Sequence, residues 1–93
     1  MSSPLDVLDQ CRAIFAERGA AYGGVENNFE RAAALASLML DRELSAYDVA
    51  TVLLAVKLAR AAHDPGHVDS HFDTVNYAAF RAVLPKTSKG ENS

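Results

Sequence analysis

The sequence has only one cysteine, Cys11, and this excludes an intrachain disulfide. Neither a CxxC motif nor a cysteine–histidine pair at metal-ligand spacing is present, so a zinc-stabilised fold is excluded as well. No Ser/His/Asp or Cys/His arrangement indicates a nucleophilic catalyst, and a glycine-rich phosphate loop is missing. The lone cysteine predicts a protein of the reducing cytoplasm.

An excess of basic residues is also missing. The 93-residue chain has 9 Lys and Arg against 12 Asp and Glu, a formal net charge of −3. Proteins that bind long nucleic acids usually carry a basic surface, so the expected partner is not a long nucleic acid. A small anion needs only two or three cations, so a small anionic ligand is not excluded. The longest apolar run, VATVLLAV, is too short to span a bilayer, and the N-terminal residues lack a signal pattern, so no membrane association is expected.

The apolar pattern predicts an all-α fold, a compact four-helix bundle-like domain over residues 1–84, with a disordered polar tail at 85–93. A domain of this size buries only a modest core, so a homo-oligomer is expected. The expected helices run from Pro4 to Gly19 or to the YGG motif at 22–24, over 27–40, over 45–62, and from a cap at Asp69 or Ser70 to just before Pro85.

Caps and apolar stripes indicate how these helices pack. Ser45 and Asp48 form a capping-box pattern before a run that is apolar almost all round, which predicts a central, buried helix. Asn27 or Asn28 is expected to cap the second helix. Core positions are expected at Leu5, Leu8, Cys11 and Phe15 in the first helix, at Phe29, Ala32, Ala33, Ala36, Met39 and Leu40 in the second, and at Phe72, Val75, Ala79 and Val83 in the fourth.

Two long cations, Lys57 and Arg60, interrupt the most apolar helix. They are three residues apart and therefore share one broad sector of it. Because burying an unpaired ammonium is costly, the side chains either reach water or pair with a carboxylate such as Asp48, Asp64 or Asp73. The other interpretation is that they bind an anion, best a phosphate, at the mouth of a pocket.

Two acidic pairs, Asp69 with Asp73 and Glu26 with Glu30, each have a spacing of four residues. Such carboxylates lie on one face of a helix, and pairs from separate helices of a bundle can hold Mg²⁺. The alternatives are that Asp69 is only a helix cap and that the pairs lie on solvated faces.

Three segments, AAYGGVENNFERAAAL, YDVATVLLAVKLAR and DSHFDTVNYAAF, together resemble an uncharacterised helical family of phages and bacteria. Its members show, in order, tyrosine–glycine, asparagine–phenylalanine, a lysine and an arginine three apart, and aspartate–serine followed by a second aspartate and a tyrosine. The resemblance covers residues 15–83. The matching positions are Tyr22, Gly23, Asn28, Phe29, Lys57, Arg60, Asp69, Ser70, Asp73 and Tyr77.

That family is similar, more distantly, to the all-α nucleoside triphosphate pyrophosphohydrolases of the MazG type. These are oligomeric and hold Mg²⁺ with acidic pairs three residues apart. The present sequence departs from the pattern, because its acidic pairs are four apart, it has no ExxE motif, and Asn76 replaces the usual glycine before Tyr77. The resemblance therefore implies a nucleotide ligand more strongly than it implies metal-dependent hydrolysis.

Three functions follow from this pattern. The first is a nucleotide-binding protein without catalytic residues, such as an anti-defence phage protein that sequesters a nucleotide immune signal in the host cytoplasm. Its ligand-binding residues would be Lys57 and Arg60 for phosphate, with Asn28, Asn76, Tyr22, Tyr77, Asp73 and Ser70 around the base and sugar. The second is a Mg²⁺-dependent pyrophosphohydrolase that uses Asp69, Asp73, Glu26 and Glu30. The third is an interaction module in which Lys57 and Asp73 form a structural ion pair.

Overall fold

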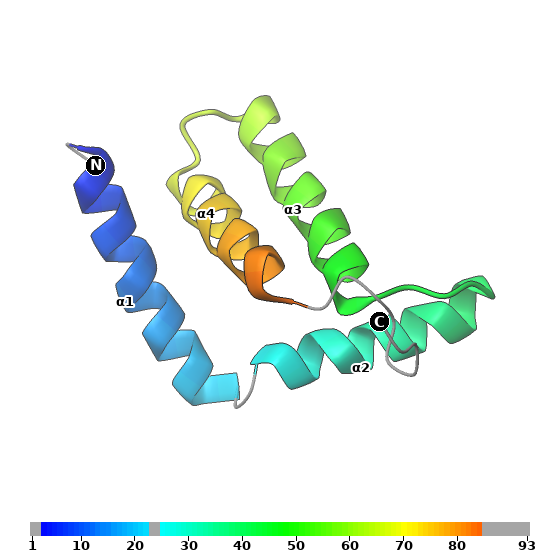
Figure 1. Ribbon diagram of the computed structural model, residues 1–93. Coiled ribbons are helices and arrows are strands. Elements are labelled where there is room, and N and C mark those ends of the chain that lie inside the picture. The colour runs from blue at the N-terminus through cyan, green and yellow to red at the C-terminus, as the bar shows by residue number, and fades with distance from the viewer. Residues whose placement is uncertain (1–2, 23–24, 85–93) are drawn as a thin grey trace.

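The computed structural model describes residues 3–22 and 25–84, with side chains for residues 3–17 and 27–84. The described chain forms four helices, and within these ranges no strand occurs (Figure 1): α1 (Pro4–Tyr22), α2 (Val25–Leu40), α3 (Ala46–His63) and α4 (Val68–Val83). The predicted all-α fold is confirmed. The predicted tail at 85–93 lies outside the described residues.

The helices pack around the hairpin that α3 and α4 form (Figure 1). α1 packs against α4, and α2 packs against α3, with the second half of α2 projecting away from the other helices. The core lies where α2, α3 and α4 meet. Its buried members are Phe29, Ala46, Ala50 and Leu84, and Val49, Leu53, Tyr77 and Phe80 pack against them.

The capping box predicted for α3 is confirmed, and a side chain also caps α1. Ser45 Oγ accepts the Asp48 N–H at 3.0 Å, and Asp48 Oδ2 accepts the Ser45 N–H at 2.9 Å, which completes the capping box. Ser3 Oγ accepts the Asp6 N–H at 3.1 Å at the start of α1. Both groups of bonds satisfy backbone donors that a helix N-terminus leaves unpaired.

The predicted caps of α2 and α4 are wrong. α2 begins at Val25, so Asn27 and Asn28 lie inside its first turn. The N-cap of α4 is His67, because the turn before it folds back on Asp64. The Asp64 carbonyl accepts the His67 N–H at 3.0 Å, and this bond sets the start of the helix upstream of Asp69.

The predicted burial is correct for part of each helix. Phe29, Ala33, Cys11 and Phe72 are buried as expected. Leu5, Leu8, Phe15, Met39, Leu40, Ala79 and Val83 were expected in the core but are exposed. In α4 two polar residues, Ser70 and Asn76, take buried positions, while the apolar Ala79 and Val83 face solvent.

α3 is flanked by α2 and α4, as its apolar sequence predicts, but it is not enclosed. Val52, Val56 and Leu58 remain 62%, 49% and 51% exposed. Within the described part of the chain, no helix combines the length and the apolar character needed to cross a membrane.

Candidate functional site

A groove of about 480 Å³ opens where the four helices approach one another. Apolar and aromatic side chains form most of its wall, and a few polar groups lie among them. The lining residues are Phe15 from α1, Asn28, Phe29 and Ala32 from α2, Val49 and Leu53 from α3, and Asp73, Asn76, Tyr77 and Phe80 from α4.

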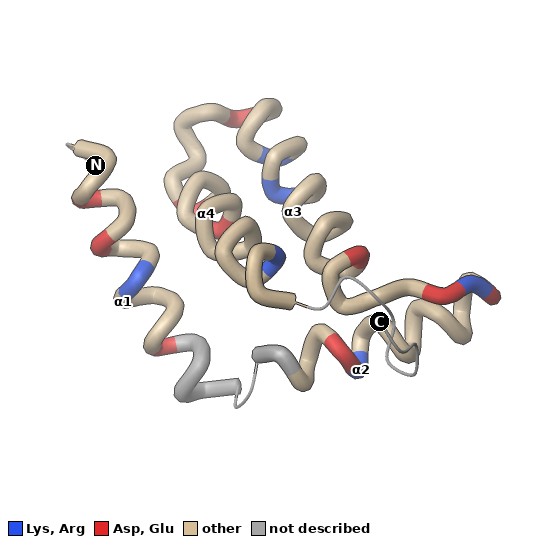
Figure 2. The backbone as a smooth tube through the Cα atoms, viewed as in Figure 1, with Lys and Arg blue, Asp and Glu red and all other residues tan. Residues whose placement is uncertain are grey.

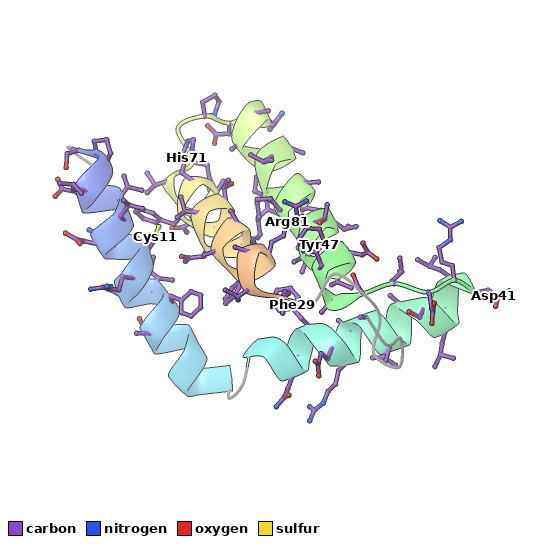
Figure 3. The ribbon with its side chains drawn as sticks, viewed as in Figure 1. Cys11, Phe29, Asp41, Tyr47, His71 and Arg81 are labelled. Atoms are coloured by element: carbon purple, nitrogen blue, oxygen red, sulfur yellow. The ribbon has the colours of Figure 1, made fainter. Side chains whose placement is uncertain are left out.

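Three aromatic rings surround Phe80 and, together with it, give the groove flat walls. The ring centroids of Phe15, Phe29 and Tyr77 lie 4.5, 5.4 and 5.9 Å from that of Phe80. Phe29 and Tyr77 meet edge to face at 6.3 Å. These distances lie in the range where aromatic pairs attract beyond simple burial, so the wall is preorganised. Figure 3 shows Phe29 at the junction of α2 with the α3–α4 hairpin.

An ion pair closes one side of the groove. Lys57 Nζ lies 3.2 Å from Asp73 Oδ2, and the two side chains are only 19% and 14% exposed. The same ammonium lies 5.8 Å from the centroid of the Tyr77 ring, a cation–π distance. Asp73 is therefore the partner of Lys57, while Asp48 and Asp64 bond to backbone N–H groups at the two ends of α3.

The other predicted ligand-binding residues take different positions. Asn28 and Tyr77 line the groove, and Asn76 does so while only 7% exposed. Arg60 is exposed, one turn after Lys57 on α3. Ser70 is buried beside the turn, where its Oγ lies 2.7 Å from His67 Nδ1, and it does not line the groove. The side chain of Tyr22 lies outside the described residues.

Acidic and basic positions both occur on each of the four helices (Figure 2). The two cations on the second half of α3 lie beside the acidic positions of α4, in agreement with the Lys57–Asp73 contact. Among the described side chains, no three His, Cys, Asp or Glu residues lie close enough to share a metal ion. Asp69, Asp73 and Glu30 thus do not form a shared metal site. The side chain of Glu26 lies outside the described residues.

Cys11 packs where α1 meets α4 (Figure 3). It is 3% exposed, and its thiol lies 3.8 Å from the Phe72 carbonyl oxygen, to which it donates. Burial raises the pKa of the Cys11 thiol, and the nearby Asp73 carboxylate raises it further. The thiol is therefore neutral, as suits a packing residue rather than a nucleophile.

Of the four rings in the aromatic wall, sequence reasoning placed only Tyr77 in the site. Phe15 and Phe29 were expected in the core, and Phe80 was not singled out. The spacing of Asp73, Asn76, Tyr77 and Phe80 contains the missing signal, because positions i, i+3, i+4 and i+7 share one helix face.

The fold and the site together define a small all-α protein with an aromatic groove bordered by an ion pair. The chain belongs to the family described as a domain of unknown function, DUF6378, whose model matches residues 6–84. It is similar to the Gene 55 protein of Mycobacterium phage D29, with 39% identity over 67 residues, 72% of this chain and 44% of the phage protein. The chain thus spans less than half of that relative's length. No solved structure matches the chain.

The family match and the phage relative confirm the coarser part of the resemblance seen in the sequence, a family of unassigned function with a phage member. The more distant similarity to MazG-type enzymes stays a prediction.

Proposed function

We propose that this protein binds a small phosphorylated nucleotide in the groove and does not turn it over. The observation that carries the proposal is the combination of a preorganised aromatic groove with the Lys57 ammonium at one edge. A nucleotide has the same two parts, a flat base and an anionic phosphate, held a few ångströms apart.

The base would lie against the aromatic wall, because its rings already contact one another and leave no gap between them. Tyr77 and Phe80 on α4 face Phe29 on α2, and stacking of a base on such rings contributes about 1–3 kcal/mol each. Asn28 at the edge and Asn76 inside supply donors and acceptors for the base or the sugar.

The phosphate would meet Lys57 and Arg60. An ammonium has three N–H donors, so the contact with Asp73 does not use all of them. Arg60 follows one turn later and is exposed, where it can approach a phosphate from solvent. Asp73 then orients Lys57 and keeps the empty site close to neutral.

The phage relative suggests the setting. A phage protein that binds a nucleotide without turning it over would sequester a signal of host immunity in the bacterial cytoplasm. The proposal concerns this chain only, because the relative is longer.

Isothermal titration calorimetry against linear nucleotides and cyclic oligonucleotides tests this function. Wild-type protein should bind at least one of them, and Lys57→Met should weaken that binding by about tenfold or more, the value of one lost charge-assisted hydrogen bond. Arg42→Met is the matched control, since Arg42 is exposed and follows Asp41 at the far end of α2 (Figure 3). Absence of binding across the panel would refute the proposal.

The second candidate is a Mg²⁺-dependent pyrophosphohydrolase, favoured by the position of the Asp73 carboxylate in the groove wall. It predicts pyrophosphate release from a nucleoside triphosphate that disappears in Asp73→Ala. Substrate that stays intact after long incubation with Mg²⁺ and Mn²⁺ would remove this candidate.

We also propose that the chain associates with a second copy of itself. Leu35, Leu38 and Met39 form an i, i+3, i+4 stripe on the projecting half of α2 and are 61%, 81% and 82% exposed. An apolar helix face of this kind is self-complementary about a two-fold axis, and pairing would add to a small core.

A further inference from the structure

The buried side chain of Asn76 is the least expected feature of the groove. It is 7% exposed, and within the part of the chain that the structure describes its amide has no hydrogen-bond partner. Leaving a buried polar group unpaired costs about 1–3 kcal/mol, and folded proteins rarely do so without a functional reason. Its neighbours on the same helix face, Asp73 and Tyr77, both line the groove with it.

The surroundings of Asn76 restrict what can pair with it. Aromatic rings and the aliphatic side chains of Val49 and Leu53 line the same groove, and this lining suits a flat, mostly apolar group. A carboxamide presents one donor and one acceptor side by side. Its complement is a planar ring edge that presents one acceptor and one donor at the same spacing.

We propose that Asn76 reads the N6–N7 edge of an adenine-type purine, where the exocyclic amine donates and the ring nitrogen N7 accepts. An asparagine amide forms two hydrogen bonds to that edge, whereas the two-acceptor edge of guanine is best met by Arg or Lys. No cation lines the groove among its described residues, and Lys57 is held at the edge by Asp73. A purine also covers more of the aromatic wall than a pyrimidine does. This inference rests on the proposed nucleotide-binding function and specifies its base.

The test compares adenosine and inosine nucleotides with equal numbers of phosphates, measured by calorimetry on the wild-type protein. The two bases share the same ring system and differ at the position that carries the amine of adenine. Adenosine nucleotides should bind about 10- to 100-fold more tightly, as expected for a bidentate contact of about 1–3 kcal/mol. Equal affinity, or tighter binding of inosine, guanosine or pyrimidine nucleotides, would overturn the adenine assignment while leaving nucleotide binding intact. Failure of every nucleotide to bind would overturn both.

Two variants test whether Asn76 is the residue that distinguishes adenosine from inosine nucleotides. Asn76→Leu keeps the side-chain volume but removes the amide, so it should abolish the preference for adenosine over inosine while retaining binding to both. Asn27→Leu is the control, because Asn27 is exposed and does not line the groove. Discrimination that persists in Asn76→Leu would contradict the assigned role. The wild-type comparison decides the outcome if this variant does not fold.

Discussion

At the scale of single residues, the question for the Lys57–Asp73 pair is whether it stabilises the fold or serves ligand binding. The two side chains are mostly buried and 3.2 Å apart, so removing one partner leaves the other charge poorly solvated. The exposure of 19% and 14% leaves some access to water, which places the pair between a surface and a fully buried ion pair.

We expect Lys57→Met and Asp73→Asn to couple by about 1–3 kcal/mol in a double-mutant cycle of urea unfolding. The physical reason is that each single variant removes the Lys57–Asp73 attraction but keeps one charge in a mostly buried position, whereas the double variant keeps neither charge. A coupling near zero would show that the pair adds nothing to folding, in which case Lys57 is free to serve binding alone. The matched cycle with Arg60→Met and Asp73→Asn should give little coupling, since Arg60 is exposed.

Cys11 predicts a pH dependence of stability. Burial and the Asp73 carboxylate raise the pKa of the folded thiol above its value in the unfolded chain, which is about 8.5. Below that pH both states hold the proton, and above it only the unfolded state releases it. Stability is therefore fully present below about pH 8.5 and falls as pH rises toward the folded pKa, by up to about 1.4 kcal/mol per pH unit.

Urea unfolding of wild type and Cys11→Ala at neutral and mildly alkaline pH measures this effect. In Cys11→Ala the free energy of unfolding should fall less with rising pH than in the wild type, because the thiol is missing. An identical decline in both proteins would assign it to other groups.

At the scale of helices, local signals were sufficient for most element positions. The Ser45–Asp48 capping box, the Pro65–Gly66 turn and the stop before Pro85 all act within a few residues, so they can be read from the sequence. The start of α4 was missed because it depends on a carbonyl of Asp64 in the preceding turn.

The buried faces were harder to predict because they depend on partners distant in sequence. Asn76 is buried in α4 although it is polar, while Val83 is 69% exposed although it is apolar. Periodicity alone cannot identify such a site, since a functional groove places polar groups where an ordinary core would place apolar ones. For Lys57, the sequence left three carboxylate partners open, and Asp73 was one of them.

The capping box gives a prediction at this scale. Ser45→Ala should lower the free energy of unfolding by about 0.5–2 kcal/mol, because it removes a buried cap and leaves the Asp48 N–H unpaired. Ser3→Ala at the start of α1 is the control and should cost less, since that cap bond is exposed. Chemical denaturation of both variants measures the difference, and equal costs would argue against a special role for the α3 cap.

At the scale of the whole molecule, the arrangement leaves apolar surface uncovered. The second half of α2 projects from the body and carries Leu38 and Met39 almost fully exposed (Figure 1). The groove lies at the opposite end of α2, around Phe29, so pairing through the projecting half would leave it open.

Light scattering coupled to size-exclusion chromatography tests the proposed pairing. Wild type should have at least twice the mass of one chain, and Leu38→Glu should shift it toward the monomer because a charge would be buried in the interface. Leu5→Glu is the matched control, as Leu5 is 72% exposed on α1. A monomeric wild type, or equal behaviour of the two variants, would contradict pairing through α2.

The central claim is that a nucleotide occupies the groove between the helices. A titration of ¹⁵N-labelled protein with adenine, guanine and pyrimidine nucleotides, followed by NMR, tests it most directly. The claim predicts that at least one nucleotide shifts the Asn76 side-chain amide and the backbone signals of Phe29, Tyr77 and Phe80, while those of Leu38 and Met39 stay in place. Unchanged spectra with every nucleotide, or changes confined to residues outside the groove, would contradict it.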